Sequence, residues 1–187
     1  MLEKVKWEPG TLLAPVPAVL VSVGDMEKSN VFTVAWTGII NSTPAKTYIS
    51  VRKERYSYDI IKKNKEFVLN LTTRDLVSAT DFCGVRSGKN IDKFKEMKLT
   101  KVEANEVKCP LVGESPISIE CRVTDVVELG THDMFIADIL CVDVAKKLID
   151  ENGRLNLDKA NLIAYSHGEY FALGEKLGKF GYTVKKK

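Results

Sequence analysis

Two stretches between residues 44 and 94 carry side chains that suit an anion, and each leads from a loop into a short predicted helix. In the first, Arg52 and Arg55 precede Ser57, a residue type that caps helix N-termini and whose hydroxyl can instead bond a ligand oxygen. A helix N-terminus adds free amide groups and partial positive charge. We therefore expect this corner to bind a phosphate group.

The second corner follows about thirty residues later along the chain. Gly84 and Gly88 would permit the left-handed backbone of an amide nest, and Asn90 is placed to cap a helix that carries Lys93 one turn inside as a mobile positive charge. The pattern predicts that both corners converge on one phosphate. The alternative is that Ser57 and Asn90 are ordinary caps and that the cations are only solvated.

Other catalytic signatures are missing from the sequence. The Gly88-Lys89 pair is followed by Asn90, where a Walker A loop needs Ser or Thr, and no G-x-G-x-x-G, G-x-S-x-G or H-E-x-x-H occurs. Only two histidines are present. We therefore expect no catalytic triad, no paired-carboxylate acid and base, and no metal site.

The elements that must position these corners are mostly strands. Alternation of apolar and polar residues is clearest over 117–124, and the run from 134 to 144 completes a predicted hairpin. Further strands are expected at 18–23, 30–36, 47–52, 67–70 and 161–165, helices at 57–64, 73–83 and 91–97, and a loop at 37–43. The prediction is a mainly β fold: one antiparallel closed or split barrel with helical insertions.

Composition narrows the functional classes. The chain has 187 residues, 44% hydrophobic and 28% charged, with a net charge of +3, as expected for one soluble globular domain spanning residues 1–187. No broad basic face is visible, so no nucleic-acid partner is expected, and Lys185–187 are interpreted as a solvated tail. The longest apolar stretch, 18–23, is too short to span a membrane.

The cysteines indicate a reducing compartment. Four of them are widely spaced with no C-x-x-C pair, and the N-terminus lacks the apolar region of a signal peptide. We therefore expect free thiols in a cytoplasmic protein.

Residues 167–182 mix glycines with four aromatic residues. Such a tail is expected to cover a groove, either on its own barrel or on a second subunit.

Several motifs occur together in a recognisable order: Pro15-x-Pro17, Asn30…Thr33…Trp36, Pro44, Ser50-Val51-Arg52, Ser57, Phe67-Val68-x-Asn70, Ser87-Gly88…Asp92-Lys93-Phe94, His132 and the glycine-aromatic tail. In this order they resemble the flavin reductase-like family, in particular its flavoredoxin branch. The resemblance implies an FMN-binding split β-barrel of Greek-key antiparallel topology, and a homodimer with FMN near the subunit interface.

The resemblance also implies roles for individual residues. Asn30, Thr33 and Trp36 match the segment beside the isoalloxazine ring of FMN. The remaining matches are Ser50, Val51 and Arg52 at the strand end that meets the phosphate, Ser57, Ser87 and Lys93 at the two phosphate corners, and His132 and Tyr165 near the flavin.

Pattern alone leaves other interpretations of three of these residues. It would place Trp36 in the core, His132 in an exposed turn and Asn30 in an ordinary turn. One position departs from the family, since Ala137-Asp138 stands where many members have Gly-Glu.

FMN would carry the redox chemistry itself, so the implied function is an FMN oxidoreductase. Electrons would pass from NAD(P)H or a redox protein to free flavin, a ferric chelate or a redox protein. Two alternatives stay open: an FMN electron-transfer protein without its own NAD(P)H site, and a non-catalytic flavin-binding barrel.

Overall fold

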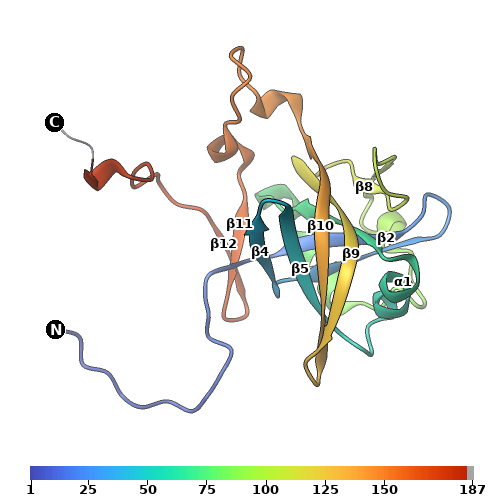
Figure 1. Cartoon of the computed structure of the whole chain (residues 1–187), viewed down its shortest axis with the longest axis horizontal. Coiled ribbons are helices and arrows are strands. Elements are labelled where there is room, and N and C mark those ends of the chain that lie inside the picture. Colours follow the sequence, from blue (N-terminus) through green and yellow to red (C-terminus); the bar gives the residue numbers. More distant parts are fainter. Residues whose placement is uncertain (185–187) are drawn as a thin grey trace.

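The barrel is built from one antiparallel sheet with the strand order β3-β2-β6-β9-β10-β5-β4 (Figure 1). The computed structural model describes residues 1–184, so the Lys185–187 tail that was expected to be solvated lies outside the described residues. The strands are β2 (Val19–Gly24), β3 (Ser29–Val34), β4 (Thr37–Ser42), β5 (Ala45–Arg52), β6 (Glu66–Leu71), β9 (Ile117–Glu128) and β10 (His132–Val144).

The connection between β3 and β4 makes this sheet curl. These strands form the two edges of the sheet, yet only Ala35 and Trp36 separate them in the chain. The two edges must therefore approach each other, which gives the split barrel that the sequence predicts. The predicted loop at residues 37–43 is wrong. Residues 37–42 form β4, because pairing with β5 outweighs a composition of Gly, Asn, Ser and Thr that disfavours strands.

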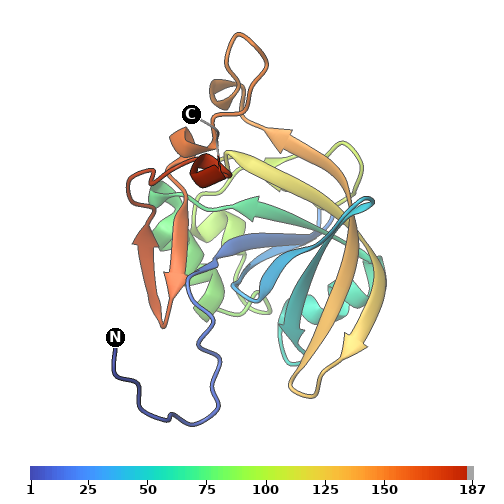
Figure 2. The same cartoon turned by 60° about the vertical axis from the view of Figure 1, so that its left-hand side comes forward.

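Two small sheets and three helices surround the barrel (Figure 2). The small strands are β1 (Val16–Pro17), β11 (Ile163–Ser166), β12 (Glu169–Ala172), β7 (Lys101–Val102) and β8 (Leu111–Val112). The α-helices are α1 (Tyr56–Asn64), α2 (Val77–Val85) and α3 (Lys93–Glu96), and short 3₁₀ segments cover Arg74–Leu76, Lys146–Leu148, Leu157–Ala160 and Tyr182–Val184.

The barrel interior is the main hydrophobic core, and α1 contributes to it. Tyr58 and Ile61 of α1 pack with buried residues of six barrel strands, among them Phe67 and Phe135, which are fully buried. The Tyr58 and Phe135 rings meet edge to face, with 5.5 Å between centroids. The helix is therefore held against the inside of the sheet, which fixes where its first turn lies.

A second core lies between the outside of the sheet and the helices α2 and α3. Leu20 and Val31 point into it, opposite to their neighbours in β2 and β3. Leu76, Ala79 and Cys83 pack there at helical spacing, as the sequence predicts for this helix. Every residue of β2 is buried, because both of its faces are covered.

The predicted hairpin is the longest pairing in the fold, between β9 and β10. The polar residues of β9 do not all face solvent. Ser118 and Glu120 are 3% and 0% exposed, because residues 104–112 cross over them. The Ser118 hydroxyl donates to Asn70 Oδ1 at 2.7 Å, which also accepts from the Val112 amide at 2.9 Å.

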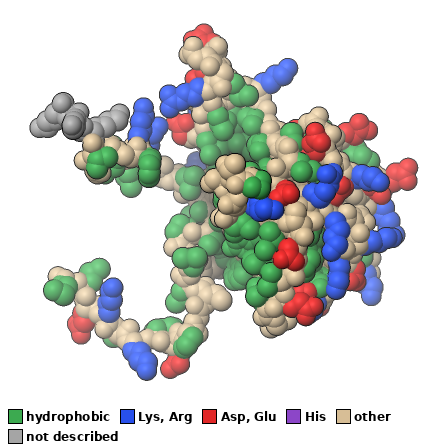
Figure 3. All heavy atoms as spheres, viewed as in Figure 1, with side chains coloured by type: hydrophobic (Ala, Val, Ile, Leu, Met, Phe, Trp, Pro, Cys, Tyr) green, Lys and Arg blue, Asp and Glu red, His purple; other side chains and the backbone are tan. Residues whose placement is uncertain are grey.

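Both ends of the described chain leave the barrel on the same side (Figure 1). Residues 1–14 have no secondary structure, and after β12 the chain runs free of the barrel. Leu177 and Phe180 are 87% and 109% exposed, so this part of the tail does not cover a groove on its own barrel. In Figure 3 the arms carry apolar side chains interspersed with charged ones, and further Lys and Arg side chains gather on the side of the barrel away from the arms.

Among residues 1–184, no helix has the length and apolar character that crossing a membrane would require.

Candidate functional site

The two predicted corners meet at one cavity of about 390 Å³, which we call the cationic cavity. Arg52, Arg55 and Ser57 line it from the first corner, and Ser87 and Lys93 line it from the second. Further basic and acidic side chains on its wall are Arg86 and Glu54. Four cations therefore face one carboxylate, which favours an anionic ligand.

Ser57 is not the helix cap that the sequence predicts. Helix α1 begins at Tyr56 with Arg55 at the N-cap position, so Ser57 lies inside the first turn and is 1% exposed. Its hydroxyl accepts a hydrogen bond from Asn30 Nδ2 at 2.7 Å. The first turn of the helix still faces the cavity, and Asn30 joins that wall from β3.

Lys93 is not a mobile surface charge. Its side chain is buried, with the residue only 3% exposed, and its Nζ donates to the Cys83 carbonyl oxygen at 2.9 Å. Burial lowers the pKa of Lys93 to about 8. An ammonium group has three donors and the described residues accept only one of them, so an anion in the cavity would complete its hydrogen bonding.

The helix that carries Lys93 also begins later than predicted. Helix α3 starts at Lys93 itself, and its N-cap is Asp92, whose carboxylate accepts from the Lys95 amide at 3.2 Å. Asn90 is therefore not a cap. The carboxylate of Asp92 is the stronger partner for the helix N-terminus because it adds a favourable charge to the hydrogen bond.

The glycines of the second corner permit close packing rather than an amide nest. Neither Gly84 nor Gly88 has a positive φ. A Cβ at Gly88 would lie 2.1 Å from Asn30 Oδ1, and one at Gly84 would lie 3.3 Å from Thr33 Cβ. The second corner can therefore pack against β3 only because these two positions lack side chains.

A second cavity, also of about 390 Å³, adjoins the first, and we call it the central cavity. Thr33, Trp36, His132 and Tyr165 line it. It shares Phe32, Arg52, Arg55 and Val85 with the cationic cavity. Each of the eleven residues predicted from the sequence lines at least one of these two cavities: Asn30, Thr33, Trp36, Ser50, Val51, Arg52, Ser57, Ser87, Lys93, His132 and Tyr165.

The three residues at the end of β5, Ser50, Val51 and Arg52, do not all line the cavity expected to hold the phosphate. Ser50 and Val51 line only the central cavity, and the Ser50 amide already donates to the Trp36 carbonyl oxygen at 2.8 Å. Of the three residues expected to meet a phosphate here, only Arg52 reaches the cationic cavity. Its guanidinium also contacts Glu54, with 3.2 Å between Nη1 and Oε1.

Trp36 and His132 stand at the rim of the central cavity. Trp36 is 43% exposed, so it is not the core residue that its pattern alone would indicate. His132 is paired with Arg52 across β5 and β10, and Thr131 Oγ1 lies 2.9 Å from its Nδ1. Thr33 has its hydroxyl bonded to the Thr80 carbonyl oxygen of α2, so it fixes the helix rather than offering a free group.

A buried contact holds the two walls of the site together. The Tyr58 hydroxyl on α1 donates to the carboxylate of Asp133, the residue after His132 on β10. This hydrogen bond lowers the pKa of Asp133 and raises the pKa of Tyr58 to about 12. Lys53 Nζ lies 3.3 Å from the other oxygen of Asp133. The helix with Ser57 and the strand with His132 are thereby joined.

Arg55, which the sequence places at the first corner with Arg52, lines both cavities and donates to the Gly84 carbonyl oxygen at 3.0 Å. Sequence reasoning missed two other residues of the site. Asp81 and Tyr170 also line the central cavity, with 3.5 Å between the Tyr170 hydroxyl and Asp81 Oδ1. They are far apart in sequence, so no local pattern joins them.

Ala137 and Asp138, which stand where many members of the resembled family have Gly-Glu, lie on β10. The Ala137 side chain is fully buried, and Asp138 is paired across the sheet with Lys46, whose Nζ binds its carboxylate. Asp138 thus has a structural partner.

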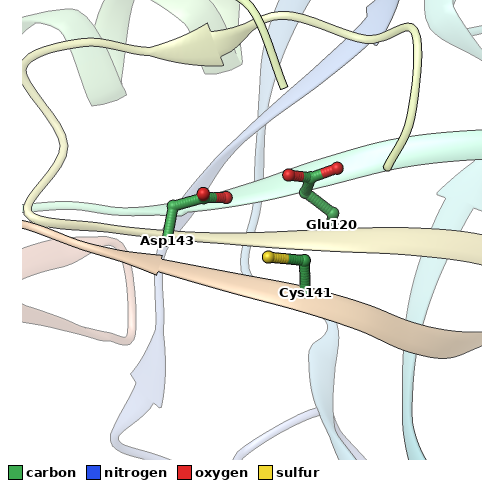
Figure 4. Close-up of side chains that lie close together, drawn as sticks. All are labelled: Glu120, Cys141 and Asp143. Atoms are coloured by element: carbon green, nitrogen blue, oxygen red, sulfur yellow. The ribbon is translucent and has the colours of Figure 1, made fainter. Parts of the chain in front are cut away.

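One further cluster of polar groups is formed by Glu120, Cys141 and Asp143, whose potential ligand atoms lie within 4.8 Å of one another (Figure 4). Glu120 is fully buried, and its two oxygens accept from the amides of residues 105, 106 and 107 at 2.6–2.9 Å. Burial and the neighbouring carboxylate raise the pKa of Asp143. The cluster therefore anchors the loop above β9, and it lies outside the two cavities.

A family model and solved structures match most of the chain. Residues 12–174 match the family model described as "Flavin reductase like domain". A solved flavoredoxin of Desulfovibrio vulgaris (Miyazaki F) has 32% identity and a TM-score of 0.90, with 98% of this chain and 100% of that chain covered.

Curated relatives extend the comparison. An uncharacterised protein of Archaeoglobus fulgidus is 34% identical over 130 residues, which is 70% of this chain and 73% of that protein. An FMN reductase (NADH), RutF, of Escherichia coli is 22% identical over 108 residues, covering 58% of this chain and 63% of its own.

Proposed function

Because the chain belongs to the flavin reductase-like family, we propose that it is an FMN-dependent oxidoreductase. In this proposal it passes electrons from a reduced nicotinamide, or from a redox protein, through FMN to an acceptor. One observation carries the proposal: a cavity with four cations and a cavity lined by Trp36 and Tyr165 share part of their walls. An FMN molecule has the same two parts, a phosphate and a planar ring system.

The described residues fit the phosphate of FMN. Lys93 is a buried cation, and two of its three N–H donors have no partner among the described residues. Arg52 and Arg55 add guanidinium groups that suit phosphate oxygens. The absence of a side chain at Gly88 leaves the backbone of the second corner against Asn30. We therefore assign the phosphate to the cationic cavity and the isoalloxazine ring to the central cavity.

The chain's own residues would bind and orient the ring rather than react. FMN supplies the hydride and single-electron chemistry when it is bound. Trp36 and Tyr165 offer aromatic faces beside the central cavity, and His132 adds an imidazole to the same wall. The Tyr58–Asp133 contact holds His132 and Ser57 at a fixed separation. We propose no catalytic acid, base or metal ion from this chain.

The decisive test compares FMN with riboflavin, which lacks the phosphate. We expect the purified protein to be yellow, and the flavin-free protein to bind FMN more tightly than riboflavin by about 1.5–3 kcal/mol, the typical value of a charge-assisted contact. Fluorescence titration of both flavins measures this difference. Equal affinity for the two ligands would overturn the phosphate assignment. A colourless protein whose Tm does not rise with FMN would indicate a barrel without a flavin function.

The electron donor is a separate question. The name of the Escherichia coli relative, FMN reductase (NADH), supports NADH as the donor in this chain. Anaerobic stopped-flow mixing of the FMN-loaded protein with NADH and with NADPH tests this, and we expect NADH to bleach the flavin absorbance. If neither nucleotide does so, the protein is an electron-transfer flavoprotein that receives electrons from another redox protein.

We also propose a homodimer and a cytoplasmic location. The exposed apolar side chains of both arms, among them Trp7 and Phe180, would be covered by a second copy. The four cysteines are free thiols, which suits a reducing compartment. In this proposal the whole chain, residues 1–187, acts as one FMN-binding domain.

A further inference from the structure

A third cavity, of about 490 Å³, lies on the other side of Trp36, and we call it the apolar cavity. Leu12 and Leu13 of the N-terminal arm form one wall, and the aromatic residues Tyr48 and His167 line it together with Trp36. None of the Lys, Arg, Asp and Glu side chains within residues 1–184 lines it. Its size and lining are typical of a site for a small, uncharged molecule.

The apolar cavity adjoins the cavity that we assign to the flavin ring. The two share Ala35, Trp36, Tyr165 and Gly168. A molecule in the apolar cavity would therefore lie beside the ring. The lack of cations on the wall disfavours the phosphates of a free flavin nucleotide and the carboxylates of a ferric chelate, because neither would find a partner for its charge there.

His167 supplies a polar group at this otherwise apolar wall. It forms the turn between β11 and β12 with Gly168, and the pairing of Ser166 with Glu169 leaves only these two residues in the turn. Both have positive φ, +49° for His167 and +92° for Gly168. Asn-Gly is the pair that such turns prefer, so a histidine here is held in a disfavoured conformation. Its imidazole makes no hydrogen bond to the residues that the structure describes.

We propose that the apolar cavity binds a neutral planar aromatic carbonyl compound of the quinone type, with His167 donating a hydrogen bond to the carbonyl oxygen. Aromatic rings of Trp36 and Tyr48 would contact the flat face of the ligand. The role of this ligand as electron acceptor rests on the function proposed above, whereas its binding does not. As acceptor, the quinone would leave as the hydroquinone after gaining a hydride that originates in the reduced nicotinamide and a proton from solvent.

Three probes that do not take up electrons test the binding. Coumarin is a neutral bicycle with a carbonyl oxygen, naphthalene lacks the carbonyl, and coumarin-3-carboxylate adds a charge. With the FMN-loaded protein, quenching of tryptophan fluorescence should show that coumarin binds and that the carboxylate binds at least about tenfold more weakly. Failure of coumarin to bind up to its solubility limit would overturn the proposal, as would equal binding of the carboxylate.

Two pairs of variants locate the ligand. His167→Gly keeps the turn, since Gly suits its backbone, and it removes the donor, so it should weaken coumarin binding about fivefold more than naphthalene binding. Leu12→Asp should weaken both neutral ligands, whereas Leu2→Asp should weaken neither, because Leu2 is 89% exposed and lies outside the cavity. Equal loss of coumarin and naphthalene in His167→Gly would show that no hydrogen bond forms and would overturn this part of the proposal.

Competition with FMN separates this inference from the proposed function. Coumarin that binds equally well to flavin-free and FMN-loaded protein occupies a cavity of its own, as we propose. Coumarin that FMN displaces lies in the central cavity, which would overturn the inference. If the protein binds coumarin with the expected variant effects but binds no FMN, the inference stands and the proposed function fails. Coumarin binding that weakens with rising protein concentration would assign the cavity to a second copy of the chain.

Discussion

Lys93 is the buried cation of the cationic cavity, so its charge state should decide how tightly the site binds a phosphate. Burial lowers its pKa to about 8, so the flavin-free site loses its ammonium charge as the pH rises above that value. A bound phosphate favours the charged form, and binding must then take up a proton. We predict that the affinity for FMN, relative to riboflavin, falls by up to about tenfold per pH unit above pH 8.

The matched variant for this prediction is Lys93→Met, which keeps the buried stem and removes the charge. It should lower the FMN affinity at pH 7 by about 1.5–3 kcal/mol and abolish the pH dependence of the FMN-to-riboflavin ratio above pH 8. Lys89→Met is the control, because Lys89 is exposed and does not line the cavity. An unchanged pH profile in Lys93→Met would remove this residue from the phosphate site. Fluorescence titrations between pH 6 and 9.5 supply the measurement.

The close approach of Asn30 to Gly88 leads to a second prediction about a single residue. A methyl group at this position would meet Asn30 Oδ1 at 2.1 Å, so Asn30 must move and its hydrogen bond to Ser57 must break. Gly88→Ala should lower the free energy of unfolding by about 1–3 kcal/mol and weaken FMN binding. Gly174→Ala is the control, since nothing lies within 4 Å of its Cβ position. Urea unfolding and FMN titration measure the two effects, and a Gly88→Ala protein that matches the control would contradict the close packing.

These two residues show what the sequence could and could not tell. Residue types were sufficient to predict that the two corners meet, as they do at the cationic cavity, because cations and small polar groups near two helix starts are a local pattern. The roles were wrong in detail. Buried Lys93 donates to a carbonyl oxygen of α2, and only a glycine at position 88 leaves room for Asn30 of β3, so both roles depend on partners that no local pattern specifies.

At the scale of elements, the site depends on how α1 is held against β10. The Tyr58–Asp133 hydrogen bond is the main cause of the lowered pKa of Asp133. A carboxylate with a lowered pKa contributes stability above the pKa of an unfolded aspartate, about 3.8–3.9, and this contribution is lost as the pH falls through its own, lower value. We predict that Tyr58→Phe lowers the Tm at pH 7 by several degrees, and that the difference from the unmodified protein shrinks below pH 3.

Tyr56→Phe is the control for this contact, because Tyr56 lies on the same helix and is 38% exposed. It should leave the Tm at pH 7 nearly unchanged. Thermal unfolding followed by circular dichroism at pH 7 and at pH 2.5 makes the comparison. A Tyr58→Phe protein with the same deficit at both pH values would show that lost packing, and not the hydrogen bond to Asp133, causes the effect.

The elements themselves were largely predictable, with one instructive failure. The β9–β10 hairpin and the buried strand β2 carry strong apolar patterns, and both are found where expected. Strand β4 was read as a loop because its residues have little intrinsic preference for strands, and pairing with β5 decides its conformation. This pairing leaves only Ala35 and Trp36 between β3 and β4, and both of these residues line the central cavity.

At the scale of the whole molecule, the two arms present apolar surface that the barrel does not cover. Leu177 and Phe180 are 87% and 109% exposed, and Trp7 of the N-terminal arm is 77% exposed. Apolar side chains displayed on extended segments indicate a surface that associates with another chain. Since both arms leave the same side of the barrel, a second copy could cover both at once (Figure 3).

The double variant Leu177→Ser and Phe180→Ser tests this dimer. We expect the unmodified protein to sediment as a dimer and the double variant to dissociate at least about tenfold more readily, because two large apolar side chains lose their burial. Lys176→Ser with Lys179→Ser is the matched control on the same segment and should stay dimeric. Neither pair lines the cationic or central cavity, so binding of FMN within one subunit should persist in both. Sedimentation velocity over a range of concentrations makes the measurement. A monomeric unmodified protein, or equal dissociation of the two double variants, would show that the tail does not form the interface.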